Sequence, residues 1–148
     1  MLMDTNGHTI LSEDYVSYEV AKLLKEKGFD EKCSYEWGVP DIDGGYILQK
    51  WSIYNGEIRN SELINDAYSA PTLQMACKWL REVHNIFIEI YLPSHSEHED
   101  TIYHGTYSFD IFNLNKKVYV YCTWNEKEFN SYEEAIEAAI KYTLENLI

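Results

Sequence analysis

Residues 69–92, SAPTLQMACKWLREVHNIFIEIYL, join a helix to a strand and decide the fold. Pro71 suits the first helical turn, with Ser69 or Ala70 just before it. At about 100° per residue, one broad arc of this helix is apolar and comprises Leu73, Ala76, Cys77, Trp79, Leu80 and Val83. Asn85 can end the helix. Side chains then alternate between two strand faces, one with Ile86, Ile88, Ile90 and Leu92 and the other with Phe87, Glu89 and Tyr91.

The same stretch crowds Cys77, Arg81 and His84 into a few turns, which raises the question of a catalytic site. Cys77 lies on the apolar arc, where a free cysteine behaves as a small apolar residue, whereas Arg81 lies on the polar side. His84 falls in the last turn, where the helix dipole favours a cation. No base near in sequence is placed to activate the thiol. We therefore interpret the crowding as helix packing and predict no catalytic residue in it.

Two further helices are indicated by their capping residues. The first begins after Ser17 and stops at Gly28, where Phe29 can fold back on Leu24. The last begins at Ser131, which forms a capping box with Glu134. Its buried arc comprises Ile136, Ala139, Ile140, Thr143, Leu144 and Leu147.

Strand patterns occupy much of the remaining sequence. Residues 46–54 alternate like a strand between turn signals, and residues 57–69 have the many turn formers of a long surface loop. Residues 93–100, PSHSEHED, look like a polar loop, and residues 101–112 and 118–124 resume as strands. The order predicts an α+β fold, a two-layer sandwich in which about three helices pack on one face of a mostly antiparallel sheet. We expect a single domain spanning residues 1–148.

In that arrangement the second sheet face is rich in aromatic rings. It would carry Phe87, Tyr91, Tyr119 and Tyr121, with Phe112 as a further candidate. Left uncovered, such a face is a surface for a protein partner or for a second copy of the chain. The alternative is that the 54–70 loop covers it.

The formal charge of −13 excludes two classes of partner. Nucleic acids and anionic membranes are bound by lysine and arginine clusters, so we expect neither here. A basic protein partner, or mimicry of nucleic acid, fits this charge, as does simple solubility. The N-terminus lacks a signal-peptide pattern, and no apolar run is long enough to span a bilayer. Three widely spaced cysteines favour free thiols and a cytoplasmic location.

One cluster contains metal-ligand chemistry, within the predicted 93–104 loop. His95 and His98 lie among acidic residues and are weak candidates for zinc or a harder cation. Because the two histidines are not fixed on a helix, a solvated polar loop explains them better. The chain has no phosphate-binding glycine loop, nucleophile elbow or paired cysteine motif, so we expect no cofactor.

Three segments together resemble a family of short acidic proteins from gut Bacteroidetes and their phages and prophages. They are VSYEVAKLLKEKGFDE (16–31), APTLQMACKWLREVHNI (70–86) and SYEEAIEAAIKYTLENL (131–147). The matching positions are mainly helix caps and core residues, and no activity is established for the family. The resemblance implies a small phage-type protein that binds and modulates host machinery.

The sequence thus favours a non-enzymatic, cytoplasmic protein-interaction module. The alternative is a small-ligand-binding protein or a hydrolase-like enzyme, with its site where loop 54–70 meets loop 93–104. The two hypotheses differ in what they predict, because the first needs exposed aromatics in one patch and the second needs a pocket with a perturbed carboxylate or histidine.

Overall fold

The structure is a computed structural model that describes residues 2–3, 9–10, 13–38, 45–51, 56–64, 66–97, 100–103, 105–123 and 127–148. Of residues 2–3, 9–10, 94–97 and 100–103 it describes the backbone alone. The helices are α1 (Tyr18–Glu26), α2 (Leu73–His84) and α3 (Tyr132–Asn146), with a short 3₁₀ turn, η1 (Asn60–Glu62). The strands are β1 (Leu2–Met3), β2 (Thr9–Ile10), β3 (Tyr35–Trp37), β4 (Leu48–Lys50), β5 (Tyr68–Ser69), β6 (Ile86–Tyr91), β7 (Ser94–Glu97), β8 (Asp100–Tyr103), β9 (Ser108–Asn113) and β10 (Val118–Cys122).

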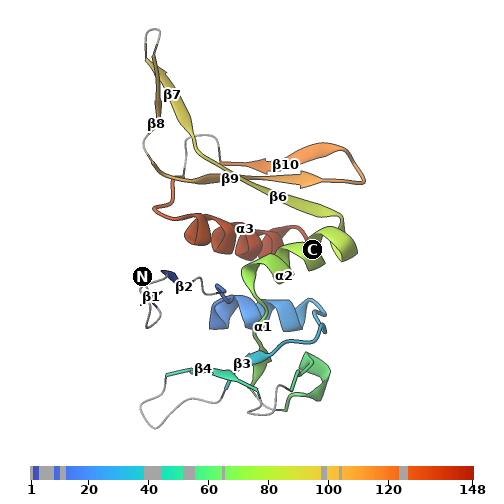
Figure 1. The fold of residues 1–148 in the computed structure, drawn as a ribbon. Coiled ribbons are helices and arrows are strands. Elements are labelled where there is room, and N and C mark those ends of the chain that lie inside the picture. Colours follow the sequence, from blue (N-terminus) through green and yellow to red (C-terminus); the bar gives the residue numbers. More distant parts are fainter. Residues whose placement is uncertain are drawn as a thin grey trace.

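The helices lie between two antiparallel sheets (Figure 1). One sheet has the order β10-β9-β6 and packs on α2 and α3. The other has the order β4-β3-β5 and packs on α1, which itself contacts α3. The predicted α+β class is confirmed. The predicted arrangement, a sheet with helices on one face, describes only the β10-β9-β6 half. The strands β3, β4 and β5 form a second sheet on the opposite side of the helices (Figure 1).

The helix caps follow the sequence closely. Ser17 accepts a hydrogen bond from Val20 N, and Ser131 accepts one from Glu134 N, as predicted. Gly28 takes a positive φ of 89°, and Phe29 N donates to Leu24 O, which closes the C-terminal turn of α1.

The start of α2 lies later than predicted. The cap is Thr72, whose hydroxyl accepts from Met75 N, so Pro71 precedes the helix instead of opening it. Thr72 also forms a β-bridge with Tyr15, and Pro71 O accepts from Val16 N. These bonds hold the chain extended up to the cap.

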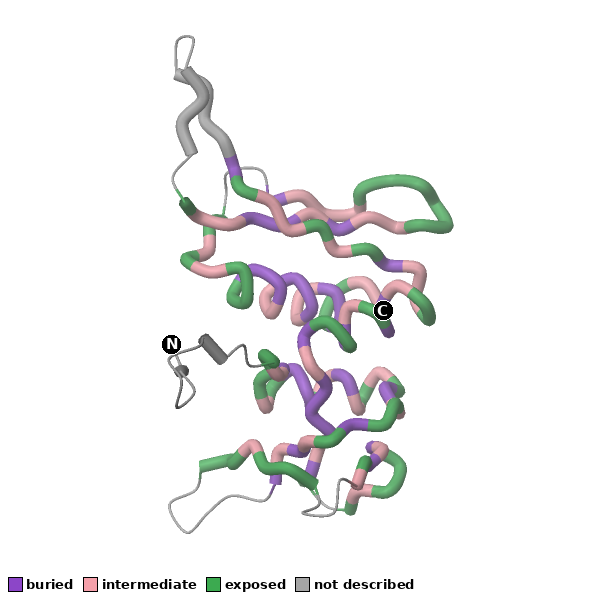
Figure 2. Tube along the Cα trace, viewed as in Figure 1, coloured by how far each residue is buried: buried purple, intermediate pink, exposed green. Residues whose placement is uncertain are grey.

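The core connects the helices with the inner faces of β6 and β9. Buried segments line the sides of the helices and strands that face each other (Figure 2). The fully covered side chains include Leu24, Leu80, Ile111, Ile140 and Leu144. Trp79 is 6% exposed and packs edge-on against Phe29, which ties α2 to the end of α1.

Two segments predicted to be loops contain regular structure. The predicted loop at residues 93–100 includes β7, which pairs antiparallel with β8, and residues 101–103 of β8 belong to the strand predicted at 101–112. The 57–69 tract includes η1 and β5, and it buries Ile58, Asn60 and Ser69. The side chain of Asn60 holds the tract in place. Its Nδ2 donates to Phe29 O, and its Oδ1 accepts from Ser69 N. A buried amide that satisfies two distant backbone groups gives a polar sequence a defined conformation.

Candidate functional site

The side of the β10-β9-β6 sheet that faces away from the helices is the outer face. Strand register defines its members, because β6 and β9 pair Phe87 with Phe112 and Glu89 with Asp110, and β9 and β10 pair Phe112 with Tyr119. Residues paired directly across a sheet project from the same face. The outer face therefore includes Phe87, Glu89, Tyr91, Ser108, Asp110, Phe112, Tyr119 and Cys122.

An aromatic row crosses all three strands of this face. It runs from Phe87 through Phe112 to Tyr119, and the last two rings meet edge-on with centroids 5.1 Å apart. Phe87 is 41% exposed and Tyr119 is 54% exposed. The described elements leave this face open, except where β7 and β8 rise from one end (Figure 1). The row is an apolar strip in contact with solvent.

The carboxylates of Glu89 and Asp110 lie beside the aromatic row and accept hydrogen bonds from two tyrosines of the outer face. The Tyr119 hydroxyl donates to Glu89 Oε2 at 3.2 Å, and the Tyr91 hydroxyl donates to Asp110 Oδ1 at 3.3 Å. The hydrogen bond to Glu89 raises the pKa of Tyr119, and burial followed by the charge of Asp110 raises that of Tyr91. The two hydrogen bonds orient both phenol rings on the outer face.

The structure gathers three of the four predicted aromatic residues on this face. Phe87, Tyr91 and Tyr119 lie there, and Phe112 joins them. Tyr121 does not, because the register shifts between Tyr119 and Tyr121 and the ring points to the helices. It stacks on Tyr142 of α3 with centroids 4.0 Å apart. An extra residue in one strand reverses the alternation beyond it, and this β-bulge is why the predicted position was wrong.

The alternation along β6 placed Glu89 on the face of Phe87 and Tyr91, but neither Glu89 nor Asp110 was predicted as a site residue. Asp110 of β9 accepts from the Tyr91 hydroxyl of β6 and from Thr123 N just after β10, so it links its strand to both neighbouring strands. Glu89 and Asp110 alternate with apolar residues in their strands, and that pattern was the available signal. What the sequence lacked was the register that makes them neighbours.

Cys77 and His84 do not form a common site. Cys77 is half-buried beside α3 and β6, and burial raises its pKa to about 12. His84 instead packs edge-on against Trp79 with centroids 4.5 Å apart, and burial lowers its pKa. Burial also raises the pKa of Cys33 to about 11. A protonated thiol is a poor nucleophile, so the predicted packing role fits these residues.

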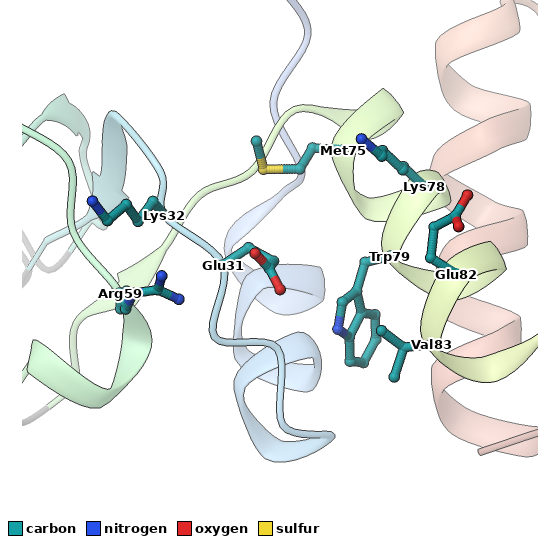
Figure 3. Close-up of a pocket in the computed structure, with 8 residues that line it drawn as sticks. All are labelled: Glu31, Lys32, Arg59, Met75, Lys78, Trp79, Glu82 and Val83. Atoms are coloured by element: carbon teal, nitrogen blue, oxygen red, sulfur yellow. The ribbon is translucent and has the colours of Figure 1, made fainter.

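A cleft of about 350 Å³ lies between α2 and the chain at residues 31–32 and 59 (Figure 3). Its lining comprises Glu31, Lys32, Arg59, Met75, Lys78, Trp79, Glu82 and Val83. Trp79, Met75 and Val83 supply apolar surface, and Val83 is 55% exposed although it continues the apolar arc of α2. Charges of both signs line the rim. The cleft therefore has no single electrostatic preference.

The ligand site predicted between loops 54–70 and 93–104 is wrong. The described parts of these two segments lie at opposite ends of the molecule, with the helices between them (Figure 1). Of the described side chains in these two segments, Arg59 alone lines the α2 cleft. The error arose because η1 and β5 lie at the β4-β3-β5 end of the molecule, whereas β7 and β8 extend from the opposite end (Figure 1).

The metal candidates fall outside what the structure describes. His98 and the side chain of His95 are in this category. Among the side chains that are described, no group of three histidine, cysteine or acidic residues is arranged to hold a metal ion. Every helix in the described ranges is too short or too polar to cross a bilayer.

Comparisons with protein-family models, with curated proteins and with solved structures give no match.

Proposed function

We propose that this chain is a protein-interaction module that binds a partner through the outer face of the β10-β9-β6 sheet. The aromatic row Phe87–Phe112–Tyr119 carries the proposal, because Phe87 and Tyr119 are exposed and Tyr119 is held by Glu89. Aromatic side chains bury large areas with little loss of rotamer freedom, which makes them frequent anchors of protein interfaces.

The partner is a protein with a basic surface. Glu89 and Asp110 lie beside the aromatic row, and the whole chain has a formal charge of −13. Such a charge attracts a basic protein over long range and repels nucleic acid and anionic lipid. The resemblance to phage and prophage proteins supports a cytoplasmic partner from host machinery.

The double variant Phe87→Ser with Tyr119→Ser tests the outer face. Tagged wild-type protein is used to capture partners from a Bacteroidetes lysate, and the affinity of any purified partner is then measured directly. Loss of two interface anchors is expected to weaken binding at least about 30-fold, which corresponds to the roughly 2 kcal/mol of one strong hot spot. Circular dichroism and the melting temperature check that the variant is folded.

Ile64→Ser is the matched control, because Ile64 is 77% exposed and lies in the β4-β3-β5 half of the chain. It removes exposed apolar surface without touching the outer face, so its affinity should equal that of the wild type. Equal binding by the double variant and the control would exclude the outer face as the docking surface. Sedimentation equilibrium distinguishes a second copy of this chain from a different partner.

A further inference from the structure

The backbone at the free edge of β6 is arranged to accept another strand. Leu114 N donates to Asn85 O at 2.8 Å, and Ile86 is the next residue in register, opposite Asn113. Hydrogen-bonded and non-hydrogen-bonded pairs alternate along an antiparallel ladder. Phe87, Glu89 and Tyr91 thus bond to β9.

The alternate residues of β6 face the other way. The N–H and C=O groups of Ile86, Ile88 and Ile90 point away from β9, toward the edge. Within the described part of the chain, no strand pairs with this edge. It therefore offers a row of backbone donors and acceptors at alternate residues.

A groove of about 320 Å³ lies along this edge, between β6, α2 and the start of α3. Its lining comprises Gln74, Cys77, Arg81, Phe87, Ile88, Glu89, Ile90, Tyr132 and Ile136. A strand added beside β6 would direct alternate side chains into this groove. Its other side chains would extend the outer face next to Phe87 and Glu89.

The two edges of the sheet differ in how they are protected. The β10 edge contains the bulge between Tyr119 and Tyr121, and Lys116 and Lys117 precede it. Bulges and lysines are features that discourage pairing at an edge. The β6 edge is six residues long, keeps an unbroken register and has Glu89 as its sole charge. Such an edge is suited to pairing.

We propose that the edge of β6 binds an extended, basic segment of the partner by strand addition, which rests on the proposed function and specifies its geometry. Backbone hydrogen bonds supply affinity, and the groove selects apolar side chains at alternate positions. Lysine or arginine at the other positions meets Glu89. Arg81 does not oppose this, because its Nε is held by Glu82 at 3.2 Å. Two copies of a chain with charge −13 repel each other, which disfavours self-pairing.

Backbone methylation tests this on the unmodified protein. The probe is a ten-residue peptide in which valine alternates with lysine. One isomer is N-methylated on the valines and the other on the lysines, so charge and composition are identical. If the peptide pairs antiparallel to β6 with its valines in the groove, the valine N–H groups face β6. Methylating the valines then weakens binding at least tenfold, whereas methylating the lysines does not. The reverse order supports a parallel strand, and equal affinities overturn the proposal.

Amide hydrogen exchange measured by NMR provides a second readout. The amides of Ile88 and Ile90 are expected to exchange rapidly in the free protein and at least tenfold more slowly with the unmethylated peptide. Those of Phe87 and Glu89 exchange slowly in both states. A peptide of the same composition with valines and lysines in separate blocks should give no such protection. Protection by both peptides would mean charge attraction alone and overturn the proposal.

The outcomes separate this inference from the proposed function. If partner binding needs Phe87 and Tyr119 but leaves the Ile88 and Ile90 amides unprotected, the edge inference fails and the proposed function stands. If the Phe87→Ser, Tyr119→Ser variant binds the partner as well as the wild type does, the proposed function fails. Slow exchange of the Ile88 and Ile90 amides in a dimer without peptide would show that a second copy of this chain occupies the edge. That result would overturn the proposal that a partner segment binds there.

Discussion

At the scale of single residues, position within an element determines what each side chain does. Tyr119 and Tyr121 are two residues apart in one strand, yet Tyr119 is exposed on the outer face and Tyr121 stacks on α3. Cys77 and His84 share a helix, but one lies against α3 and β6 and the other against Trp79. In both comparisons, the residue type alone does not determine the surroundings of the side chain, which depend on the fold of the backbone.

The thiol of Cys77 should react slowly with iodoacetamide in the folded protein. Because its pKa is raised to about 12, only a minute fraction is thiolate at pH 8. Since the thiolate is the reacting form, we expect alkylation roughly 1,000-fold slower than for an unperturbed cysteine, with a rate that still increases above pH 10. Peptide mapping by mass spectrometry assigns the reaction to Cys77.

Unfolding in urea is the control for this measurement, because it returns the thiol to water and should restore ordinary reactivity. Rapid alkylation of Cys77 in the folded protein at pH 7 would contradict the packing role. It would instead indicate an activated thiol.

At the scale of elements, local sequence signals were sufficient where capping and periodicity agreed. The bounds of α1 and α3 follow from Ser17, Gly28 and Ser131, because each satisfies backbone groups at a helix end. The same local signals could not place β7, whose polar sequence lacks an alternating pattern, although residues 101–103 of β8 fall within the strand predicted at 101–112. They also missed the order within residues 57–69, because Asn60 bonds to Phe29 O, 31 residues away.

Replacing Asn60 by alanine tests how much of that segment depends on one amide. The change leaves Phe29 O and Ser69 N without their partners in a buried site. Each unsatisfied buried group costs about 1–3 kcal/mol, so the free energy of unfolding should fall by about 2–4 kcal/mol. Urea denaturation followed by tryptophan fluorescence measures the loss.

Ser61→Ala is the neighbouring control. The Ser61 hydroxyl donates to Asp30 Oδ2 in an exposed position, and we expect its loss to cost less than about 1 kcal/mol. If the two variants were equally stable, Asn60 would not hold the segment in place.

At the scale of the whole molecule, the helices lie between the two sheets, so the sheets are at opposite ends of the molecule. Figure 1 places β3, β4 and η1 at one end and the outer face at the other. The sequence predicted the α+β class, because that depends on periodicity. It could not predict two sheets, because strand partners are chosen by contacts such as Glu36 with Ser69 that are distant in sequence. For the candidate site, the sequence predicted three of the four aromatic residues correctly. It could not predict which residues lie opposite one another, because that depends on strand register.

The excess of acidic residues should make stability depend on salt. With 25 acidic and 12 basic residues, like charges repel across the folded surface. Raising ionic strength from 0.01 M to 0.15 M shortens the screening length from roughly 30 Å to roughly 8 Å. We expect the melting temperature to rise, by roughly 3 °C for each kcal/mol of repulsion removed. Scanning calorimetry at the two salt concentrations measures this.

Lys141→Met provides a comparison within the same experiment. Lys141 pairs with Glu19 on the surface, so its removal eliminates one attraction and makes the net charge more negative. Its melting temperature should therefore depend on salt more steeply than that of the wild type. A wild-type melting temperature that falls with added salt would mean that ion pairs outweigh repulsion.

The joint between α2 and β6 has a consequence for how this surface is specified. Asn85, with a φ of 58°, is the sole residue between the end of the helix and the start of the strand. One added residue at that joint would turn the isoleucines of β6 toward water and press Phe87 and Glu89 against the helices. The spacing at Asn85 thus decides which alternate side chains of the β6 hexapeptide face solvent.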